Sequence, residues 1–195
     1  MNTDPSIPPD LRARNLRTVG ALAALFVLPL ALSFWMYYGG GWQPSGRTNN
    51  GELLQPVRPL PLDRWPEGKV LTEKWSLVYI AAGNCDSRCR NALIVMRQTR
   101  LSLNQDMQRV NRVLIAGSGC CDEAFLQREH AGLLRLDAGS EGATEALQVF
   151  PGGQRADSIF LVDPLGNLVM RYDDRSDPKG LLQDLKKLLK LSHIG

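Results

Sequence analysis

The stretch "WSLVYIAAGNCDSRCRNALIVM", residues 75–96, places two cysteines at the junction between two kinds of apolar pattern. Residues 75–80 are a short run of apolar and β-branched side chains, which is typical of a buried strand. After the cysteines, Ala92, Leu93 and Met96 recur at helical spacing. The chain is therefore predicted to pass from strand to helix where the two thiols lie.

The rest of the chain continues this alternation. Apolar strands are expected at 111–117 and 133–138, helices at 120–130 and 142–150, a hairpin at 158–172 and an amphipathic helix at 177–191. The resulting order is β-α-β-α-β-α-β-β-α, which predicts an α/β fold of the thioredoxin-like type, with a central mixed sheet flanked by helices. The first two strands should be parallel neighbours, with the cysteines at the carboxyl edge where ligands gather.

A separate apolar segment lies near the start of the chain. Residues 18–38, "TVGALAALFVLPLALSFWMYY", contain no charge, and a helix of this length can cross the hydrocarbon core of a membrane. Arg12, Arg14 and Arg17 precede it, which puts the N-terminus in the cytoplasm by the positive-inside rule. The alternative is a cleaved signal peptide, whose apolar region is usually shorter, at about 7–15 residues.

These signals divide the chain into four parts. We expect a cytoplasmic N-terminus at 1–17, a transmembrane helix at 18–38, a linker and extended lead-in at 39–68, and a thioredoxin-like domain at 69–195. The lead-in is dense in Pro, Gly and Asn and lacks apolar periodicity. The net charge of +3, without a basic run interleaved with aromatics, argues against nucleic acid as a partner.

The two cysteines of the first junction, Cys85 and Cys89, are the leading candidates for chemistry. A thiol at the first turn of a helix has a lowered pKa, because the helix dipole and nearby cations favour the thiolate. Their spacing would put both sulfurs on one face of a helical turn, where they can form a disulfide or hold one soft metal ion. The alternative is a purely structural pair.

The sequence resembles the Sco/SenC family, membrane-anchored thioredoxin-like factors in the assembly of the copper centre of cytochrome c oxidase. The resemblance rests on the anchor, the lead-in "TNNGELLQP" at 48–56, the C-x-x-x-C of Cys85 and Cys89, and "DSIFLVDPLGNLVMRY" at 157–172. It implies a cytochrome c oxidase subunit or another assembly factor as partner. It also implies a bacterial inner-membrane protein whose domain faces the periplasm, where disulfides can persist.

The chain departs from the family pattern at the third copper ligand. The family has Asp-His-Ser before the hairpin, and its histidine completes a Cys-Cys-His copper site, whereas this chain reads "ADS" with Asp157 in that position. The usual proline within the C-x-x-x-C is also absent. Two thiolates suffice for soft Cu(I), but a carboxylate is a poor substitute for imidazole at Cu(II). We therefore expect Cu(I) binding and weak Cu(II) binding.

A second cysteine pair, Cys120 and Cys121, follows the second strand of the domain. In a parallel arrangement this pair would emerge at the same edge as Cys85 and Cys89. Adjacent cysteines rarely bond to each other, so we expect that one of them supplies a third thiolate or relays a disulfide. The alternative is that both are small residues packed at the start of a helix.

Other polar and sulfur side chains have simpler interpretations. His130 and His193 are expected at the surface, and Asp163 and Gly166 are explained by the hairpin turn. Three methionines are expected to be packing residues: Met96, Met107 and Met170. No other group competes with the cysteines as a site.

Three mechanisms follow from these expectations. The protein could transfer Cu(I) by ligand exchange, or act as a thiol–disulfide oxidoreductase that attacks through Cys85 and resolves with Cys89. It could also be a non-catalytic assembly or scaffold factor whose cysteines form a structural disulfide. The missing histidine favours thiol chemistry or a specialised assembly role over metal transfer.

Overall fold

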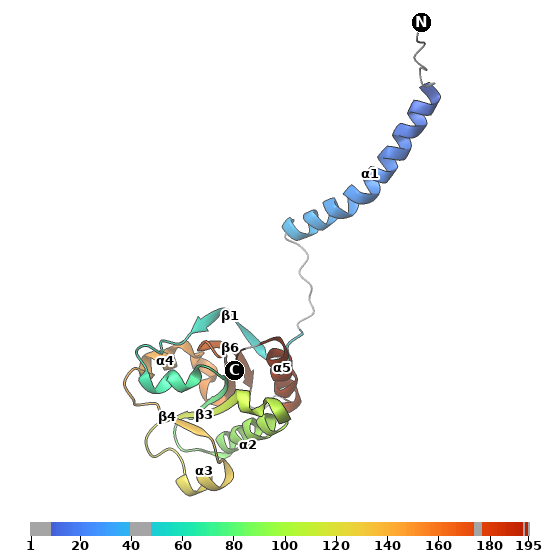
Figure 1. Cartoon of the computed structure of the whole chain (residues 1–195). Coiled ribbons are helices and arrows are strands. Elements are labelled where there is room, and N and C mark those ends of the chain that lie inside the picture. The colour runs from blue at the N-terminus through green and yellow to red at the C-terminus, as the bar shows by residue number, and fades with distance from the viewer. Residues whose placement is uncertain (1–8, 40–47, 174–176, 193, 195) are drawn as a thin grey trace. The chain divides into compact units, whose positions relative to one another are not determined.

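The computed structural model describes residues 9–39, 48–173, 177–192 and 194. The chain forms two compact units, Met1–Arg47 and Thr48–Gly195 (Figure 1). The first unit contains α1, Pro9–Tyr38, with Pro29 inside it. Within the described residues, only the segment Ala13–Tyr38 is long and apolar enough to cross a membrane.

The second unit is built on one mixed sheet. Its strands lie in the order β1-β6-β5-β2-β3-β4, with β2, β3 and β4 parallel and the remaining pairs antiparallel. The strands are β1 Glu52–Pro59, β2 Trp75–Ile80, β3 Val110–Ala116, β4 Leu134–Asp137, β5 Ser158–Val162 and β6 Asn167–Asp173. The predicted thioredoxin-like sheet, with β2 and β3 as parallel neighbours, is confirmed.

Helices cover both faces of the sheet. They are α2 Ser87–Leu101, α3 Glu123–Glu129, α4 Ala143–Val149 and α5 Pro178–Leu191, with short 3-10 helices η1 Pro66–Leu71, η2 Asn104–Arg109 and η3 Gly152–Asp157. One core cluster joins the sheet to α2 and α5, and a second joins its other face to η1 and α4. Figure 1 shows α2 beside α5.

The alternation of side chains along β2 explains why the sheet is covered on both sides. Leu77 and Tyr79 belong to the cluster beneath α2, whereas Val78 and Ile80 belong to the cluster beneath η1 and α4. Successive side chains of a strand point to opposite faces of the sheet. A strand with apolar side chains on both faces therefore needs other elements packed against both sides of the sheet. The central position of β2 fixes where the chain leaves the sheet toward Cys85.

The extended lead-in expected within 39–68 includes a strand that the sequence did not predict. This strand is β1, which pairs with β6 and places Glu52 opposite Arg171. The register shifts between Leu53 and Arg58, around Pro56. Proline lacks a backbone donor, so it is tolerated at the edge of a sheet, and β1 is an edge strand. The Pro-rich composition therefore concealed a strand whose pairing partner lies more than a hundred residues away.

The turn between β5 and β6 has the geometry that its sequence predicts. Gly166 has φ of +82°, a conformation that side chains other than glycine rarely adopt. The Asp163 Oδ1 atom accepts hydrogen bonds of 2.9 Å from the backbone N–H groups of Leu165 and Asn167. These contacts account for both residues without any role in a site.

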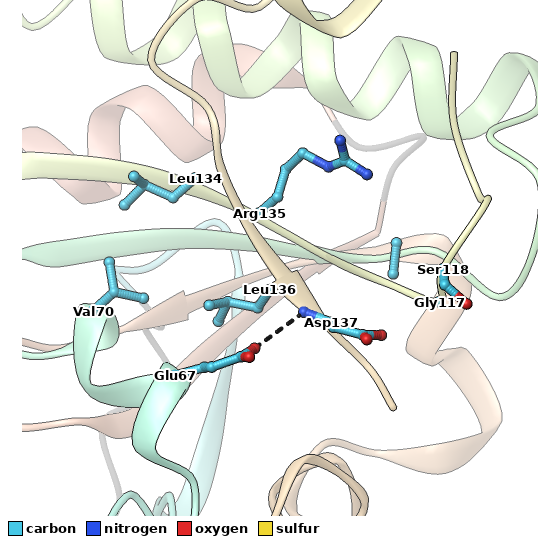
Figure 2. A pocket seen from close by; sticks show the side chains of 9 residues that line it. Glu67, Val70, Gly117, Ser118, Leu134, Arg135, Leu136 and Asp137 are labelled. Carbon is cyan, nitrogen blue, oxygen red and sulfur yellow. Dashed lines mark hydrogen bonds between the residues drawn. The ribbon is translucent and has the colours of Figure 1, made fainter. Parts of the chain in front are cut away.

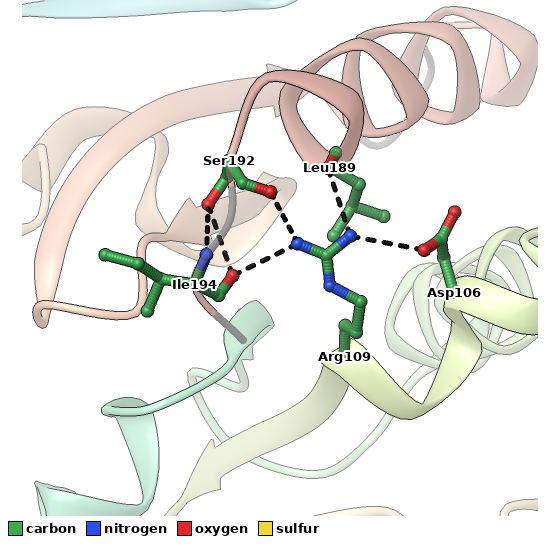
Figure 3. Close-up of polar contacts among 5 residues, drawn as sticks. All are labelled: Asp106, Arg109, Leu189, Ser192 and Ile194. Atoms are coloured by element: carbon green, nitrogen blue, oxygen red, sulfur yellow. Dashed lines mark hydrogen bonds and ion pairs between the residues drawn. The ribbon is translucent and has the colours of Figure 1, made fainter.

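The end of α5 is tied to η2 by Arg109, the last residue of η2. Its guanidinium donates to the carbonyl oxygens of Leu189, Ser192 and Ile194 at 3.0, 2.7 and 3.2 Å, and it pairs with Asp106 at 3.2 Å. Figure 3 shows this network. A cation is favourable at a helix C-terminus because the last carbonyls have no partners within the helix.

Candidate redox site

Cys85 and Cys89 lie where β2 passes into α2, as predicted. The helix begins at Ser87, with Asp86 as its N-cap, so Cys89 lies in the first turn and Cys85 lies just before the cap. The two residues form a disulfide with Cα atoms 5.1 Å apart. Cys89 is 2% exposed, whereas Cys85 is partly exposed. The pair thus combines one partly exposed cysteine with one buried cysteine.

The N-cap places a negative charge beside the buried cysteine. The Asp86 Oδ1 atom accepts a hydrogen bond of 3.0 Å from the Cys89 backbone N–H. This bond satisfies one of the amides that a helix start leaves without a partner. Asp86 therefore stabilises the turn that holds Cys89, while its charge opposes formation of a thiolate there.

Arg88 and Arg90 provide positive charge at the same turn. Arg88 Nη1 lies 2.7 Å from Asp157 Oδ1, and the Arg90 guanidinium lies over the Phe125 ring at 5.1 Å from its centroid. Both arginines project from the first turn of α2. Cations at this point favour the thiolate when the disulfide is reduced.

Asp157 lies beside the cysteines, at the end of η3. It lines a cavity of about 160 Å³ together with Cys89, Asp86 and Arg88. Its carboxylate is engaged by Arg88. The position that carries a histidine in the Sco/SenC pattern is therefore close to the Cys85–Cys89 disulfide. In this chain it holds Asp157, which forms an ion pair with Arg88.

Cys120 and Cys121 lie in the loop between β3 and α3. The helix begins at Glu123, so both cysteines precede it and are not part of the expected helix at 120–130. Contrary to expectation, they form a disulfide with each other. Gly119, with φ of +84°, makes a tight turn before the pair, and both cysteine side chains contact the same core cluster.

The two cysteine loops are in direct contact. The Cys85 backbone N–H donates to the Cys120 carbonyl oxygen at 3.1 Å. This contact arises because β2 and β3 are parallel neighbours, with Ile80 opposite Ile115. The prediction that both pairs emerge at one edge of the sheet is therefore confirmed, although a shared ligand set stays a prediction.

His130 does not contribute to this edge. His130 is buried, at 1% exposed, so its expected surface position is wrong. It caps α3 and packs edge-on against Phe125. Burial, followed by the charges of Arg112 and Arg97, lowers its pKa. His193 lies outside the described residues.

The methionines that were considered as ligands belong to the core. Met96 and Met170 are buried in the cluster that contains Cys89, and Met107 packs against it. Their thioethers fill space in this cluster between the sheet and its helices. The interpretation as packing residues is confirmed.

A larger pocket, of about 580 Å³, lies at the carboxyl ends of β3 and β4. Figure 2 shows Glu67 and Asp137 on its walls, with the Glu67 Oε2 atom accepting a hydrogen bond of 3.4 Å from the Asp137 N–H. Gly117 and Ser118, which lead to Cys120, also line it. No pattern in the sequence indicates this pocket, because its walls come from three separate elements.

A family model described as a transmembrane-like, thioredoxin-like, C-terminal domain matches residues 75–192. The chain belongs to this family. The match extends from the first residue of β2 to the end of α5 and so includes both cysteine pairs of the thioredoxin-like domain. No curated protein is a detectable sequence relative of the chain.

Solved structures share the fold of this thioredoxin-like domain. Copper-bound yeast Sco1 has a TM-score of 0.54 at 17% identity, with 75% of this chain and 96% of that chain covered. Copper-bound ScoI of Arabidopsis thaliana has a TM-score of 0.51 at 18% identity, with 64% and 89% covered. At these identities the likeness is one of fold.

The thioredoxin-like domain has no preformed cluster for a metal among its described residues. No group of three or more His, Cys, Asp or Glu side chains within 48–173, 177–192 and 194 is arranged to hold one. All four cysteines are in disulfides. Because the thiolate is the metal ligand, either pair must first be reduced before it can bind Cu(I).

Proposed function

We propose that the protein is a membrane-anchored, Sco/SenC-type thiol–disulfide oxidoreductase that acts in cytochrome c oxidase biogenesis, with Cys85 and Cys89 as its working pair. The observation that carries this proposal is the disulfide at the start of α2, with a partly exposed Cys85 and a buried Cys89. Such an arrangement lets a partner reach one sulfur while the other waits to resolve the mixed disulfide.

In the reducing direction, the Cys85 thiolate attacks a disulfide of the client. The client bond breaks, one client sulfur leaves as a thiolate, and a mixed disulfide forms through Cys85. Cys89 then attacks the Cys85 sulfur and releases the second client thiolate. Two electrons pass to the client, and a dithiol donor must afterwards reduce the Cys85–Cys89 bond. The proposed client is a cytochrome c oxidase subunit or another assembly factor.

The location of this chemistry follows from α1. The apolar segment Ala13–Tyr38 would anchor the chain in the bacterial inner membrane. Arg14 and Arg17 at its N-terminal end would keep that end in the cytoplasm. The redox domain would then face the periplasm, where the disulfide can persist.

Cu(I) handling at the same pair is the second candidate. It is favoured by the fold shared with two Sco proteins that have copper bound. Asp157 argues against a complete site for Cu(II), since Arg88 engages its carboxylate and carboxylate is a harder ligand than imidazole. Cys120 and Cys121 are the nearest further sulfur ligands, because Cys120 contacts Cys85 through the backbone.

The test uses the full-length chain in detergent under anaerobic conditions. In glutathione redox buffers, mass spectrometry after alkylation should show Cys85 and Cys89 opening and closing together. Cys89→Ser should accumulate a mixed disulfide with glutathione at Cys85. A Cys85–Cys89 bond that stays closed in reducing buffer in the folded protein would contradict the proposal and leave the scaffold role with a structural disulfide.

The copper arm uses the reduced chain in competition with a colorimetric Cu(I) chelator. Binding of one ion that is lost in Cys85→Ser would establish the second candidate, and additional loss in Cys120→Ser would identify a third ligand. Asp157→His should raise Cu(II) affinity by on the order of tenfold, about 1.4 kcal/mol, with a thiolate-to-copper absorption band. An unchanged Cu(II) affinity would show that this position cannot complete the site.

A further inference from the structure

The loop after β3 carries a second disulfide in contact with the first, and the mechanism above leaves it without a role. We propose that the two pairs exchange a disulfide within the chain, through a transient bond between Cys85 and one sulfur of the Cys120 and Cys121 pair. This inference rests on the proposed function, because it supplies electrons to the Cys85–Cys89 pair that acts on the client.

The backbone contact brings the two pairs within reach of each other. The Cys85 N–H and the Cys120 carbonyl are joined at 3.1 Å. Hydrogen-bonded residue pairs in antiparallel strands have Cα atoms about 5.5 Å apart, and a disulfide spans Cα separations of about 4.4–6.8 Å. A direct backbone hydrogen bond between the two loops therefore holds them at a separation of the order that a mixed disulfide requires.

The burial of the four cysteines follows the same pattern in both pairs. Cys89 and Cys120 are buried, at 2% and 8% exposed, whereas Cys85 and Cys121 are partly exposed. All four residues belong to or pack against one apolar cluster. Each pair therefore combines one partly exposed cysteine with one buried cysteine.

A cation bridges the helices that follow the two loops. Arg90, in the first turn of α2, reaches the Phe125 ring in the first turn of α3. Arg90 also follows Cys89 directly in the sequence. Positive charge near a thiol favours the thiolate, which is the attacking form in disulfide exchange.

The exchange balances without any reagent from outside the chain. When Cys120 and Cys121 are reduced, one of them attacks the Cys85 sulfur as a thiolate. The Cys85–Cys89 bond breaks, and Cys89 leaves as a thiolate and takes up a proton. The second thiol of the adjacent pair loses its proton and attacks the sulfur bonded to Cys85, which releases the Cys85 thiolate. Two electrons and one proton, and with them one net negative charge, have moved from the Cys120–Cys121 pair to the Cys85–Cys89 pair, and the reverse exchange uses the same atoms.

This arrangement separates the entry of electrons from their use. A protein dithiol can reduce Cys120–Cys121 through the partly exposed Cys121, on the loop between β3 and α3. The client meets Cys85, on the loop between β2 and α2. Donor and client then need not compete for the same sulfur.

The first experiment follows the position of one disulfide in time. The fully reduced full-length chain is treated with one equivalent of diamide, a two-electron thiol oxidant, and excess reagent is removed. Differential alkylation and mass spectrometry then measure the shares of chains with the Cys85–Cys89 bond and with the Cys120–Cys121 bond. We expect these shares to change toward a common ratio at a rate that dilution does not alter. Fixed shares, or a rate that falls on dilution, would overturn the proposal.

A second experiment traps the intermediate. Two double variants keep Cys85 with one candidate partner: Cys89→Ser with Cys120→Ser, and Cys89→Ser with Cys121→Ser. At least one, after mild oxidation, should form an intramolecular disulfide, whereas free thiols or only dimers in both would contradict the proposal. Circular dichroism checks that each variant is folded.

The Cys120→Ser, Cys121→Ser variant separates this inference from the proposed function. In that variant the Cys85–Cys89 bond should still open and close in glutathione buffer. If it does so while the wild-type shares stay fixed, the internal exchange is wrong and the proposed function stands. If the bond does not respond in either chain, the proposed function fails as well.

Discussion

At the scale of single residues, the polar groups around Cys89 set the character of its thiol. Asp86 holds the amide of Cys89 at 3.0 Å and carries the negative charge nearest to it along the chain. Arg88 offsets part of this charge but is itself paired with Asp157. The capping hydrogen bond of Asp86 and the effect of its charge can be tested separately with two different substitutions.

Replacing Asp86 with asparagine should make the reduced thiol pair more reactive. The asparagine side chain would still accept the Cys89 N–H as an N-cap, but it would no longer oppose the thiolate. Asp86→Ala removes both effects and should also cost about 1 kcal/mol of stability. Alkylation rates against pH, beside urea unfolding, measure the two quantities. Equal reactivity of Asp86→Asn and wild type would show that this charge does not influence the thiols.

His130 makes stability depend on acid. The pKa of His130 is lowered in the folded protein, mainly by burial and then by the charges of Arg112 and Arg97. His130 therefore binds a proton more readily in the unfolded chain than in the folded protein. The contribution of neutral His130 to the free energy of unfolding should therefore be complete above about pH 6.5, and the free energy of unfolding should fall as the pH decreases below that value. His130→Leu should reduce this acid slope and cost little at neutral pH, because neither ring nitrogen has a hydrogen-bond partner. Urea midpoints between pH 5 and 8, about one and a half units either side of the ordinary His pKa, measure the slope; an unchanged slope in His130→Leu would contradict this account.

At the scale of elements, the start of β1 is fastened to α5 by one buried carboxylate. Asp184 is 4% exposed and accepts hydrogen bonds from the N–H groups of Asn50 and Gly51 at 2.8 and 2.9 Å. The Tyr172 hydroxyl, from β6, donates to the same carboxylate at 2.9 Å. One side chain thus joins the lead-in, β6 and the last helix.

Tyr172 makes the same junction sensitive to alkali. Burial, followed by the charge of Asp184, raises the pKa of Tyr172, so the unfolded chain loses its proton first. The contribution of Tyr172 to the free energy of unfolding should therefore be constant below about pH 10 and should fall as the pH rises above that value. Tyr172→Phe should lose about 1 kcal/mol at neutral pH and show a smaller decline above about pH 10. Urea unfolding from pH 8 to 11, which spans the ordinary Tyr pKa of about 10, compares the two chains; parallel curves would exclude this role for Tyr172.

At the scale of the whole molecule, the proposed anchor would determine where the proposed redox chemistry takes place. Ala13–Tyr38 has the length and composition of a span, and the arginines stand on its N-terminal side. The full chain should stay in the membrane fraction after alkaline carbonate extraction. Alkaline phosphatase, which is active only outside the cytoplasm, should be active when fused after residue 195. Activity only with an N-terminal fusion would reverse the proposed orientation.

Local pattern in the sequence determined most of the framework. The mostly apolar run of β2, the helical spacing of apolar residues in α2 and the leucine face of α5 each indicate burial within a single segment of the sequence. The "DPLG" turn is likewise determined locally, because Asp163 accepts a hydrogen bond within the turn and Gly166 adopts a positive φ. The position of Cys85 and Cys89 at the strand-to-helix junction followed from the same local signals.

Tertiary structure alone decided the features that depend on distant partners. β1 is a strand because β6 offers it an edge, and no periodicity near its prolines indicates that pairing. Cys120 meets Cys85 because parallel strands bring their loops together. His130 is buried because the end of α3 packs near Arg112 of β3 and Arg97 of α2. Each of these outcomes depends on contacts between residues far apart in sequence, which hydrophobic patterning within one segment does not encode.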